Sequence, residues 1–393
     1  MSVLERIKEY EKDLFICNTC RCGFCRDDCP WFRATRVETA SARGVLQAIQ
    51  GYLEGFFKPS AAFMERLVGC YMCKYCVERC PTNALPEKVG AKVRVNEIIE
   101  LVRADLIEKG FARGKVADLL NNLRRTHNPW GSPAERRTSW AQGLPVKVAH
   151  GQCSEVFFIC CAYSYDETCK ELAKKAVTLF NKTGKDFTVL GNEQKCCGDM
   201  ALRLGERELF KELAEANLSL FEKYKIENLI TLSPHDYNTL KNDEIYRGAK
   251  INVRHYIHVI VEEIDRGKLK PSRRIDKKAT YHDPCFLGRY NKIYEEPRKV
   301  LESIPGITLA EMPRNRRYSF CCGGGSGGVL IEDAPYERRP VTERVKEALE
   351  VGAEIIVTAC PLCYINFKDA IKVLGLENKI LVKDLMELVL EVL

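Results

Sequence analysis

Cysteine is the residue type through which this sequence could do most of its chemistry. The chain has 20 cysteines among 393 residues. Nine of them lie between residues 17 and 80, in two runs that read CNTCRCGFCRDDCP and CYMCKYCVERCP. The second run has the spacing C-x2-C-x2-C-x3-C-P, which is typical of bacterial ferredoxins that bind 4Fe–4S clusters. The two runs together therefore predict two cubane clusters.

The ligands of each cubane are expected to come from both runs. In two-cluster ferredoxins the cysteine before the proline ligates the other cluster. One cubane should then be bound by Cys29, Cys70, Cys73 and Cys76. The other should be bound by Cys22, Cys25, Cys80 and either Cys17 or Cys20. The last ligand stays open because Thr19 stands where a regular run would have a cysteine. Paired C-x2-C motifs also hold zinc, but two runs of this kind favour iron–sulfur clusters.

Most of the remaining cysteines fall into two similar stretches in the second half of the chain. The separation from Cys160 to Cys196 is 36 positions, and so is the separation from Cys285 to Cys321. The later segments SPHDYNTLK and CPLCYINFK also correspond to each other. Self-similarity over about 110–120 residues indicates a duplicated domain rather than a solenoid, whose repeats are shorter.

Short apolar segments in each repeat, VFFIC, NLITLS and EIIVTAC among them, precede segments with helical spacing such as residues 206–225. Strands that alternate with helices predict a parallel sheet, and such sheets place ligands just past their strand ends. Residues 93–110 show another apolar helical face, which ends at Gly110. We therefore expect an α+β protein, with an N-terminal α-helical module for two 4Fe–4S clusters and two duplicated α/β domains.

Linkers rich in proline, glycine and basic residues suggest the domain boundaries. The expected divisions are a helical ferredoxin-like domain at 1–123, a linker at 124–150, a first repeat at 151–265, a basic linker at 266–278 and a second repeat at 279–393.

Composition narrows the classes of protein further. Lysine and arginine number 61 and the acidic residues 54, so the net charge is 61 − 54 = +7, which is too weak to argue for nucleic-acid binding. The chain opens with MSVLERIKEYEKD rather than an apolar export signal, and no uncharged apolar run reaches about 18 residues. We expect a cytoplasmic protein of anaerobic metabolism, with no transmembrane segment in this chain and membrane association only through a partner.

The motifs in the second half resemble the cysteine-rich "CCG" domain of heterodisulfide reductases. This chain has a dicluster module followed by two such domains, and in this arrangement it resembles a heterodisulfide reductase subunit. Its relatives include menaquinol-linked reductases and the iron–sulfur subunits of flavin-dependent glycolate, lactate and glycerol-3-phosphate dehydrogenases. In that family a complete five-cysteine motif binds a noncubane 4Fe–4S cluster at which disulfides are reduced. The second repeat has all five cysteines, namely Cys285, Cys321, Cys322, Cys360 and Cys363.

The first repeat departs from the family pattern, because Ser233 and Asp236 stand where CPxC would supply two ligands. Cys160 or Cys161 remains together with Cys196 and Cys197. The sequence favours a vestigial site here over a different cluster, since serine and aspartate are poor iron–sulfur ligands.

Several other residues have more than one interpretation. His282, in YHDPC, could donate a hydrogen bond to a cluster sulfur or handle a proton, or could be structural. His235 is interpreted as structural, and Cys153 and Cys169 as plain thiols. The arginines that could form a basic rim are interpreted instead as a solvated face; they are Arg289, Arg314, Arg316 and Arg317.

The resemblance implies an iron–sulfur oxidoreductase subunit, active in a complex. Electrons would pass through the two cubanes to the noncubane cluster, which reduces or oxidises a disulfide or dithiol substrate. The alternative is a relay subunit of a flavin-dependent lactate, glycolate or glycerol-3-phosphate dehydrogenase. The partner would be a membrane haem-b or quinone-reactive subunit in the first case, and a flavoprotein dehydrogenase in the second.

Overall fold

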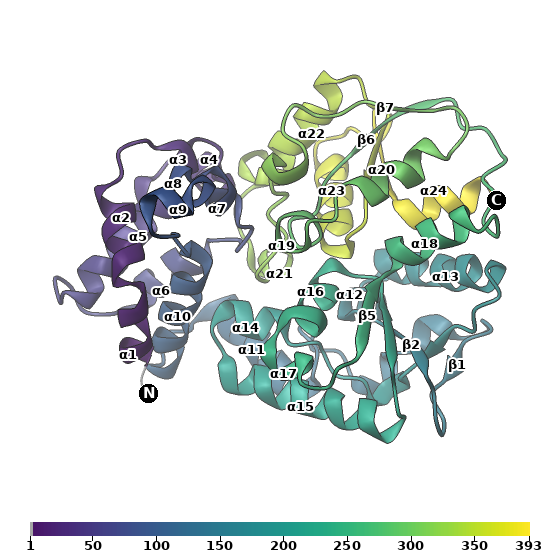
Figure 1. Cartoon of the computed structure of the whole chain (residues 1–393), viewed down its shortest axis with the longest axis horizontal. Helices are drawn as coiled ribbons and strands as arrows, with labels where there is room; N and C mark the ends of the chain where they lie inside the picture. The colour runs from purple at the N-terminus through teal and green to yellow at the C-terminus, as the bar shows by residue number, and fades with distance from the viewer. Residues whose placement is uncertain (1–2) are drawn as a thin grey trace.

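The computed structural model describes residues 3–393 and has three parts (Figure 1). An all-helical part, purple to blue, lies to the left, and two parallel sheets with flanking helices lie to the right. The first sheet belongs to the teal segment below, and the second to the green and yellow segment above. The mixture of a helical module with parallel α/β units agrees with the fold class expected from the sequence.

Short helices make up the N-terminal part, which we call the ferredoxin module (residues 3–126). Its longest helix has Ile98, Ile99, Val102 and Leu106 buried along one face, as the helical spacing predicts. The chain leaves this helix at Gly110, whose φ is +76°. The helices are α1 (Val3–Ile7), α2 (Glu11–Thr19), α3 (Phe24–Asp27), α4 (Pro30–Thr35), α5 (Ala42–Leu53), α6 (Ala61–Val68), α7 (Tyr75–Arg79), α8 (Pro81–Ala84), α9 (Pro86–Val89), α10 (Val95–Glu108) and α11 (Gly114–Thr126).

The first repeat is built on a five-stranded parallel sheet with the order β1-β3-β2-β4-β5. Its strands are β1 (Lys147–Val148), β2 (Glu155–Phe158), β3 (Thr188–Val189), β4 (Asn228–Thr231) and β5 (Asn252–His255). Its helices are α12 (Cys161–Tyr165), α13 (Glu167–Lys182), α14 (Asp199–Leu204), α15 (Arg207–Lys223), α16 (Pro234–Asn242), α17 (Glu244–Arg247) and α18 (Tyr256–Asp265).

The second repeat has a four-stranded parallel sheet with the order β7-β6-β8-β9. Strands β2 to β5 of the first repeat follow the same order, with β1 added at one edge. The strands of the second repeat are β6 (Lys277–Tyr281), β7 (Ile307–Leu309), β8 (Ile355–Thr358) and β9 (Leu381–Asp384). Its helices are α19 (Gly288–Asn291), α20 (Glu295–Glu302), α21 (Gly328–Ile331), α22 (Pro340–Glu350), α23 (Pro361–Val373) and α24 (Leu385–Glu391).

The segment expected to be a linker at 124–150 is packed against the first repeat. Its residues 147–148 form β1 and pair with β3, and its side chains Arg137 and Trp140 are 2% and 3% exposed. The segment therefore contributes buried side chains to the first repeat.

One buried arginine joins all three parts of the molecule. Arg103 of α10 is fully buried, and its guanidinium donates hydrogen bonds to the carbonyls of Cys70 and Arg203 and to Ser326 Oγ. The two repeats also meet each other, because α13 packs against α24 (Figure 1) and Tyr256 Oη lies 2.8 Å from Asp384 Oδ1. These contacts fix the positions of the cysteine groups relative to one another.

No helix in residues 3–393 combines the length and apolar character needed to cross a membrane.

Candidate iron–sulfur centres

The first group of thiols lies inside the ferredoxin module around a single cavity. Four cysteines line this cavity, namely Cys29, Cys70, Cys73 and Cys76. Cys29 comes from the first run, just before α4, and the other three come from the loop between α6 and α7 and the start of α7. These are the four residues that the crossed arrangement of the two runs assigns to one cubane.

The second group lies around a neighbouring cavity. The cysteines that line it are Cys17, Cys20, Cys22, Cys25 and Cys80. Cys20 Sγ lies 3.3 Å from Cys22 Sγ. Cys17 projects from α2, and burial, with smaller contributions from Cys25 and Cys80, raises the pKa of its thiol to about 12. Both candidates for the fourth ligand therefore reach the same cavity.

The backbone between these cysteines adopts an unusual conformation that bends the loops around the cavities. Met72 and Lys74 have φ values of +55° and +60°, a region that non-glycine residues rarely occupy. Gly23 has the same place in the first run as Lys74 in the second, with φ of +69°. Positive φ values of this kind persist where the surrounding structure fixes them, commonly at functional sites.

The donors around both cavities fit the clusters that the motifs imply. Burial raises the pKa values of the Cys29, Cys70 and Cys76 thiols, so the cavity encloses a group of neutral thiols. Iron binds the thiolate form, and ligation would replace these protons. Four thiols that enclose one space form a suitable donor set for a 4Fe–4S cluster.

The third group of thiols belongs to the second repeat and follows its strand ends. Its members are Cys285, Cys321, Cys322, Cys360 and Cys363, which are 1–8% exposed. Cys285 follows β6, and Cys360 precedes α23, directly after β8. Hydrogen bonds join neighbouring thiols along the group, and Cys322 Sγ lies 3.3 Å from Cys363 Sγ. The fold therefore brings together all five cysteines of the predicted motif.

His282 points toward this third group. One nitrogen of His282 lies within 4.8 Å of the sulfurs of Cys322 and Cys363. Arg344 Nε donates to His282 Nδ1 over 3.2 Å. Because an arginine can only donate, Nδ1 must be the unprotonated nitrogen, and the ring proton then lies on Nε2. Hydrogen bonds from Cys321, Cys363 and His282 lower the pKa of the Cys322 thiol well below its ordinary value despite burial.

His235 of the first repeat reaches across to the second. Its Nδ1 lies 2.9 Å from Asp199 Oδ2, and its ring also hydrogen-bonds to the Cys360 thiol. Burial would lower the pKa of His235, but Asp199 and Cys360 raise it to about 10. Burial likewise opposes ionisation of Cys360, whereas hydrogen bonds from Cys363 and His235 lower its pKa to about 5. The sequence interpretation of His235 as structural thus misses its contact with a predicted ligand.

The ferredoxin module and the second repeat meet directly at their cysteines. The Cys73 thiol hydrogen-bonds to the Cys321 thiol, so the first cavity adjoins the third group. Arg289 donates to the carbonyl of Cys73, and Tyr290 Oη donates to the carbonyl of Met72 over 2.6 Å. Arg289 is only 3% exposed, so its assignment to a solvated face is wrong.

The remaining thiols divide into two kinds. Cys161, Cys196, Cys197 and Asp236 come together in the first repeat, with Cys160 beside them. Ser233 instead caps α16 by accepting a hydrogen bond from the backbone N–H of His235 over 3.3 Å. Cys153 and Cys169 each lie 3.7–3.8 Å from a backbone carbonyl, as plain thiols would.

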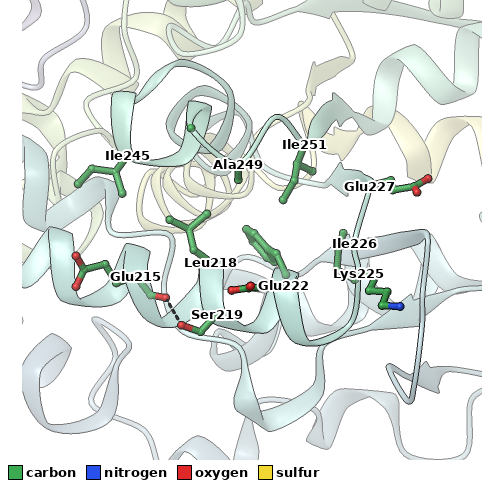
Figure 2. A pocket seen from close by; sticks show the side chains of 12 residues that line it. Glu215, Leu218, Ser219, Glu222, Lys225, Ile226, Glu227, Ile245, Ala249 and Ile251 are labelled. Carbon is green, nitrogen blue, oxygen red and sulfur yellow. Dashed lines mark hydrogen bonds between the residues drawn. The ribbon is translucent and has the colours of Figure 1, made fainter.

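A wide surface pocket lies elsewhere on the first repeat, over α15 and α17 (Figure 2). Its volume is about 720 Å³, and apolar side chains such as Leu218 and Ile251 line it beside the carboxylates of Glu215 and Glu222. None of the twelve residues that line it is a cysteine or histidine, so this pocket offers no redox chemistry.

Sequence reasoning missed the polar residues that surround the thiols. Asp199 and Arg344 reach their positions through tertiary contacts, and no motif marks them. The signal that could have indicated Asp199 is the acidic residue directly after CCG in the first repeat, where the second repeat has glycine.

Comparisons with protein families agree with this architecture. Residues 13–84 match the family described as a 4Fe-4S dicluster domain, and residues 156–241 and 279–368 both match the family described as a cysteine-rich domain. The chain thus joins a dicluster domain to two cysteine-rich domains.

Several known proteins are similar to most of this chain. The chain is 33% identical to the probable iron-sulfur-binding oxidoreductase FadF of Bacillus subtilis, over 82% of this chain and 46% of that protein. It is 30% identical to the EtfAB:quinone oxidoreductase of Syntrophomonas wolfei, over 98% of this chain and 59% of that protein. It is 29% identical to a subunit of the dihydromethanophenazine:CoB–CoM heterodisulfide reductase of Methanosarcina barkeri, over 95% of this chain and 93% of that protein. This chain spans about half the length of the first two relatives. The chain is thus similar to iron–sulfur oxidoreductases over most of its length.

Proposed function

We propose that this chain passes electrons through its two ferredoxin cavities to the five-cysteine group of the second repeat, where a disulfide or dithiol is reduced or oxidised. The order of the cysteine groups supports this route. The cavity that Cys22 and Cys25 line neighbours the cavity that Cys70 and Cys73 line. Cys73 in turn hydrogen-bonds to Cys321 of the second repeat. The Cys73–Cys321 contact is the observation that carries the proposal.

Two 4Fe–4S cubanes and one noncubane 4Fe–4S cluster are the cofactors that the three thiol groups would hold. Such clusters supply one-electron steps, whereas a disulfide couple takes two electrons. The protein's own contribution at the second repeat is to stabilise thiolates. The pKa values of Cys322 and Cys360 are lowered by hydrogen bonds from neighbouring thiols and from His282 and His235, respectively. These same groups would fix the orientation of the ligands.

The partner that follows from this function is a membrane haem-b or quinone-reactive subunit. Support comes from the relatives, since one is named as part of a dihydromethanophenazine-linked heterodisulfide reductase and another as a quinone oxidoreductase. The chain would then act only in a complex.

A thiol-binding experiment tests the disulfide chemistry. A small thiol is added to the oxidised, anaerobically purified protein, and EPR spectra are recorded before and after the addition. We expect a new paramagnetic signal, which is absent from the Cys285→Ala variant. Unchanged spectra in a protein with a full complement of iron would contradict the proposal.

Burial favours a second candidate, in which the chain only relays electrons between a flavoprotein dehydrogenase and quinone. The five thiols of the second repeat are 1–8% exposed, which suits electron transfer but leaves little room for a substrate. The relative named EtfAB:quinone oxidoreductase supports the same candidate. If a flavoprotein reduces every cluster while thiols leave the EPR spectrum unaltered, the relay function holds.

A further inference from the structure

Five potential ligands lie together in the first repeat, although its sequence lacks the complete motif. Four of them are nearly buried: Cys161, Cys196 and Cys197 are 4–6% exposed and Asp236 is 2% exposed. Hydrogen bonds join Cys161 to Cys196, Cys196 to Cys197 and Cys197 to Asp236. The fifth group is the Cys160 thiol, which is partly exposed and lies close to the Asp236 carboxylate.

Asp236 takes the place that Cys363 has in the second repeat. Asp236 lies in the first turn of α16, which follows β4, and Cys363 lies in the first turn of α23, which follows β8. Strands β4 and β8 have the same place in the strand order that the two repeats share. Each residue also hydrogen-bonds to the second cysteine of its CCG motif, Asp236 to Cys197 and Cys363 to Cys322. The replacement therefore exchanges one potential iron ligand for another at the same position.

The Asp236 carboxylate lacks a full set of partners. Its Oδ2 atom is buried and, within the described part of the chain, makes no hydrogen bond. A buried carboxylate oxygen without a partner costs a few kcal/mol, so such atoms are rare unless an ion or ordered water satisfies them. A metal ion bound at this oxygen would remove that cost.

A buried positive charge beside the thiols points to the same conclusion. Arg137 is 2% exposed, and it donates hydrogen bonds to Cys161 Sγ and to the carbonyl of Ile159, both over 3.4 Å. No carboxylate of residues 3–393 lies within ion-pair distance of it. A buried cation requires a counter-charge, and an anionic thiolate centre would supply it. In the second repeat, Arg289 lies in the same way beside Cys285 and Cys321.

The arrangement of the donors distinguishes a cluster from a single ion. In the described chain, the only three potential ligands whose atoms all lie within 4.8 Å of one another are His282, Cys322 and Cys363. The first-repeat groups instead follow one another in a line from Cys161 to Asp236. Donors spread along a line suit several metal ions better than one tetrahedral zinc ion, whose four ligands converge on a point.

We propose that the first repeat binds an iron–sulfur centre of its own, with Cys161, Cys196 and Cys197 as thiolate ligands and Asp236 as a carboxylate ligand. The Cys160 thiol, whose pKa is raised by burial and by the nearby Asp236, would complete the set. This centre goes beyond the function proposed above, and it does not depend on the substrate or on the direction of electron flow.

Iron and acid-labile sulfide in the anaerobically purified chain test this inference without turnover. Two cubanes and one noncubane cluster account for about twelve irons, and a further four-iron centre would bring the total to about sixteen. Cys197→Ala should lower the iron content by about four per chain. The matched control is Cys153→Ala, which removes a thiol of the same repeat that lies 3.7 Å from the carbonyl of His150, and it should keep all the iron.

A second variant covers the case in which Cys197→Ala does not fold. Asp236→Cys restores the cysteine that the second repeat has at this position, so the protein should keep its iron but change the Mössbauer spectrum of one centre. Wild-type protein that holds only about twelve irons, or that holds zinc in place of the additional iron, overturns the inference. A Mössbauer spectrum that is identical in Asp236→Cys overturns the ligand role of Asp236. If thiols leave the EPR spectrum unchanged but the chain holds about sixteen irons, the proposed disulfide chemistry fails and the iron–sulfur centre of the first repeat stands. The two tests are therefore separate.

Discussion

The two repeats share one strand order but face different neighbours, and this difference determines what each can do. In the second repeat, Cys321 touches Cys73 of the ferredoxin module, and all five cysteines of the motif are present. In the first repeat, α14 meets the same module through Arg203 and Glu100, whose side chains lie 2.8 Å apart, rather than through a thiol. A single αβ framework thus supports one cysteine group in contact with the ferredoxin module and another set apart from it.

A histidine connects the two groups despite this separation. His235 belongs to the first repeat, but its ring bridges Asp199 of its own repeat and Cys360 of the other. The corresponding residue of the second repeat is Leu362, which cannot make a reciprocal hydrogen bond. The polar connection therefore runs in one direction, from the first repeat to the ligands of the second.

The largest expected effect, on iron content, comes from replacing the side chains at equivalent positions of the two repeats by alanine. Cys360→Ala should abolish the noncubane centre proposed for the second repeat, with a loss of about four irons per chain, because this cysteine would be one of its ligands. Ser233→Ala, at the equivalent position, should lose no iron, since Ser233 only caps a helix. Iron analysis and EPR check both variants. Equal iron losses would show that the repeats use this position in the same way.

A smaller effect is expected at His282, whose counterpart in the first repeat is Phe158. His282→Gln should keep the iron but slow disulfide turnover by roughly 10²-fold, the lower end of what a positioned proton donor contributes. The measurement is steady-state turnover alongside iron content and the EPR spectrum. Turnover that stays at the wild-type rate would assign His282 a purely structural role.

His235→Gln should have a more modest effect on the second repeat. Glutamine is uncharged, so its introduction removes a positive charge beside Cys360 and makes reduction of the adjacent centre harder. We expect the reduction potential of that centre to become more negative, while the cubane potentials stay the same. A redox titration followed by EPR measures this. His258→Gln is the matched control, because His258 hydrogen-bonds within α18 and its cap and contacts none of the cysteine groups.

The smallest effect concerns the caps of equivalent helices, where the first repeat has His255 and the second has Asp384. Burial raises the pKa of Asp384 to about 8. The unfolded chain releases this proton near pH 4, so the free energy of unfolding falls as the pH rises from about 4 to 8. Asparagine also caps helices but cannot ionise.

Asp384→Asn should therefore stabilise the protein more at pH 8 than at pH 5, by roughly 3 kcal/mol. Thermal unfolding at the two pH values measures the difference. A variant whose stability relative to the wild type is the same at both pH values would show that Asp384 is already ionised in the folded protein. His255, whose pKa is lowered well below its ordinary value by burial, should give the opposite dependence, because below about pH 6.5 the unfolded chain takes up a proton that the folded protein does not bind.

Local spacing was enough to predict the strands and the cysteine groups. The segments VFFIC, NLITLS and EIIVTAC contain all or most of β2, β4 and β8, and the helical face at 93–110 contains α10. Arg289 and Arg137 could not be predicted in the same way. A charged residue in a polar segment looks solvated in the sequence, and only the packing of distant elements reveals that these two are buried.

The sequence by itself determined which thiols can act together within one loop, because three closely spaced cysteines must lie near one another however the rest of the chain folds. It also determined that two similar αβ units follow the ferredoxin module. Tertiary structure alone decided that Cys73 meets Cys321, that His235 crosses to Cys360, and that Asp236 takes the position of a cysteine. These contacts join residues that are far apart in the chain, and their distances depend on how whole elements pack rather than on any local pattern.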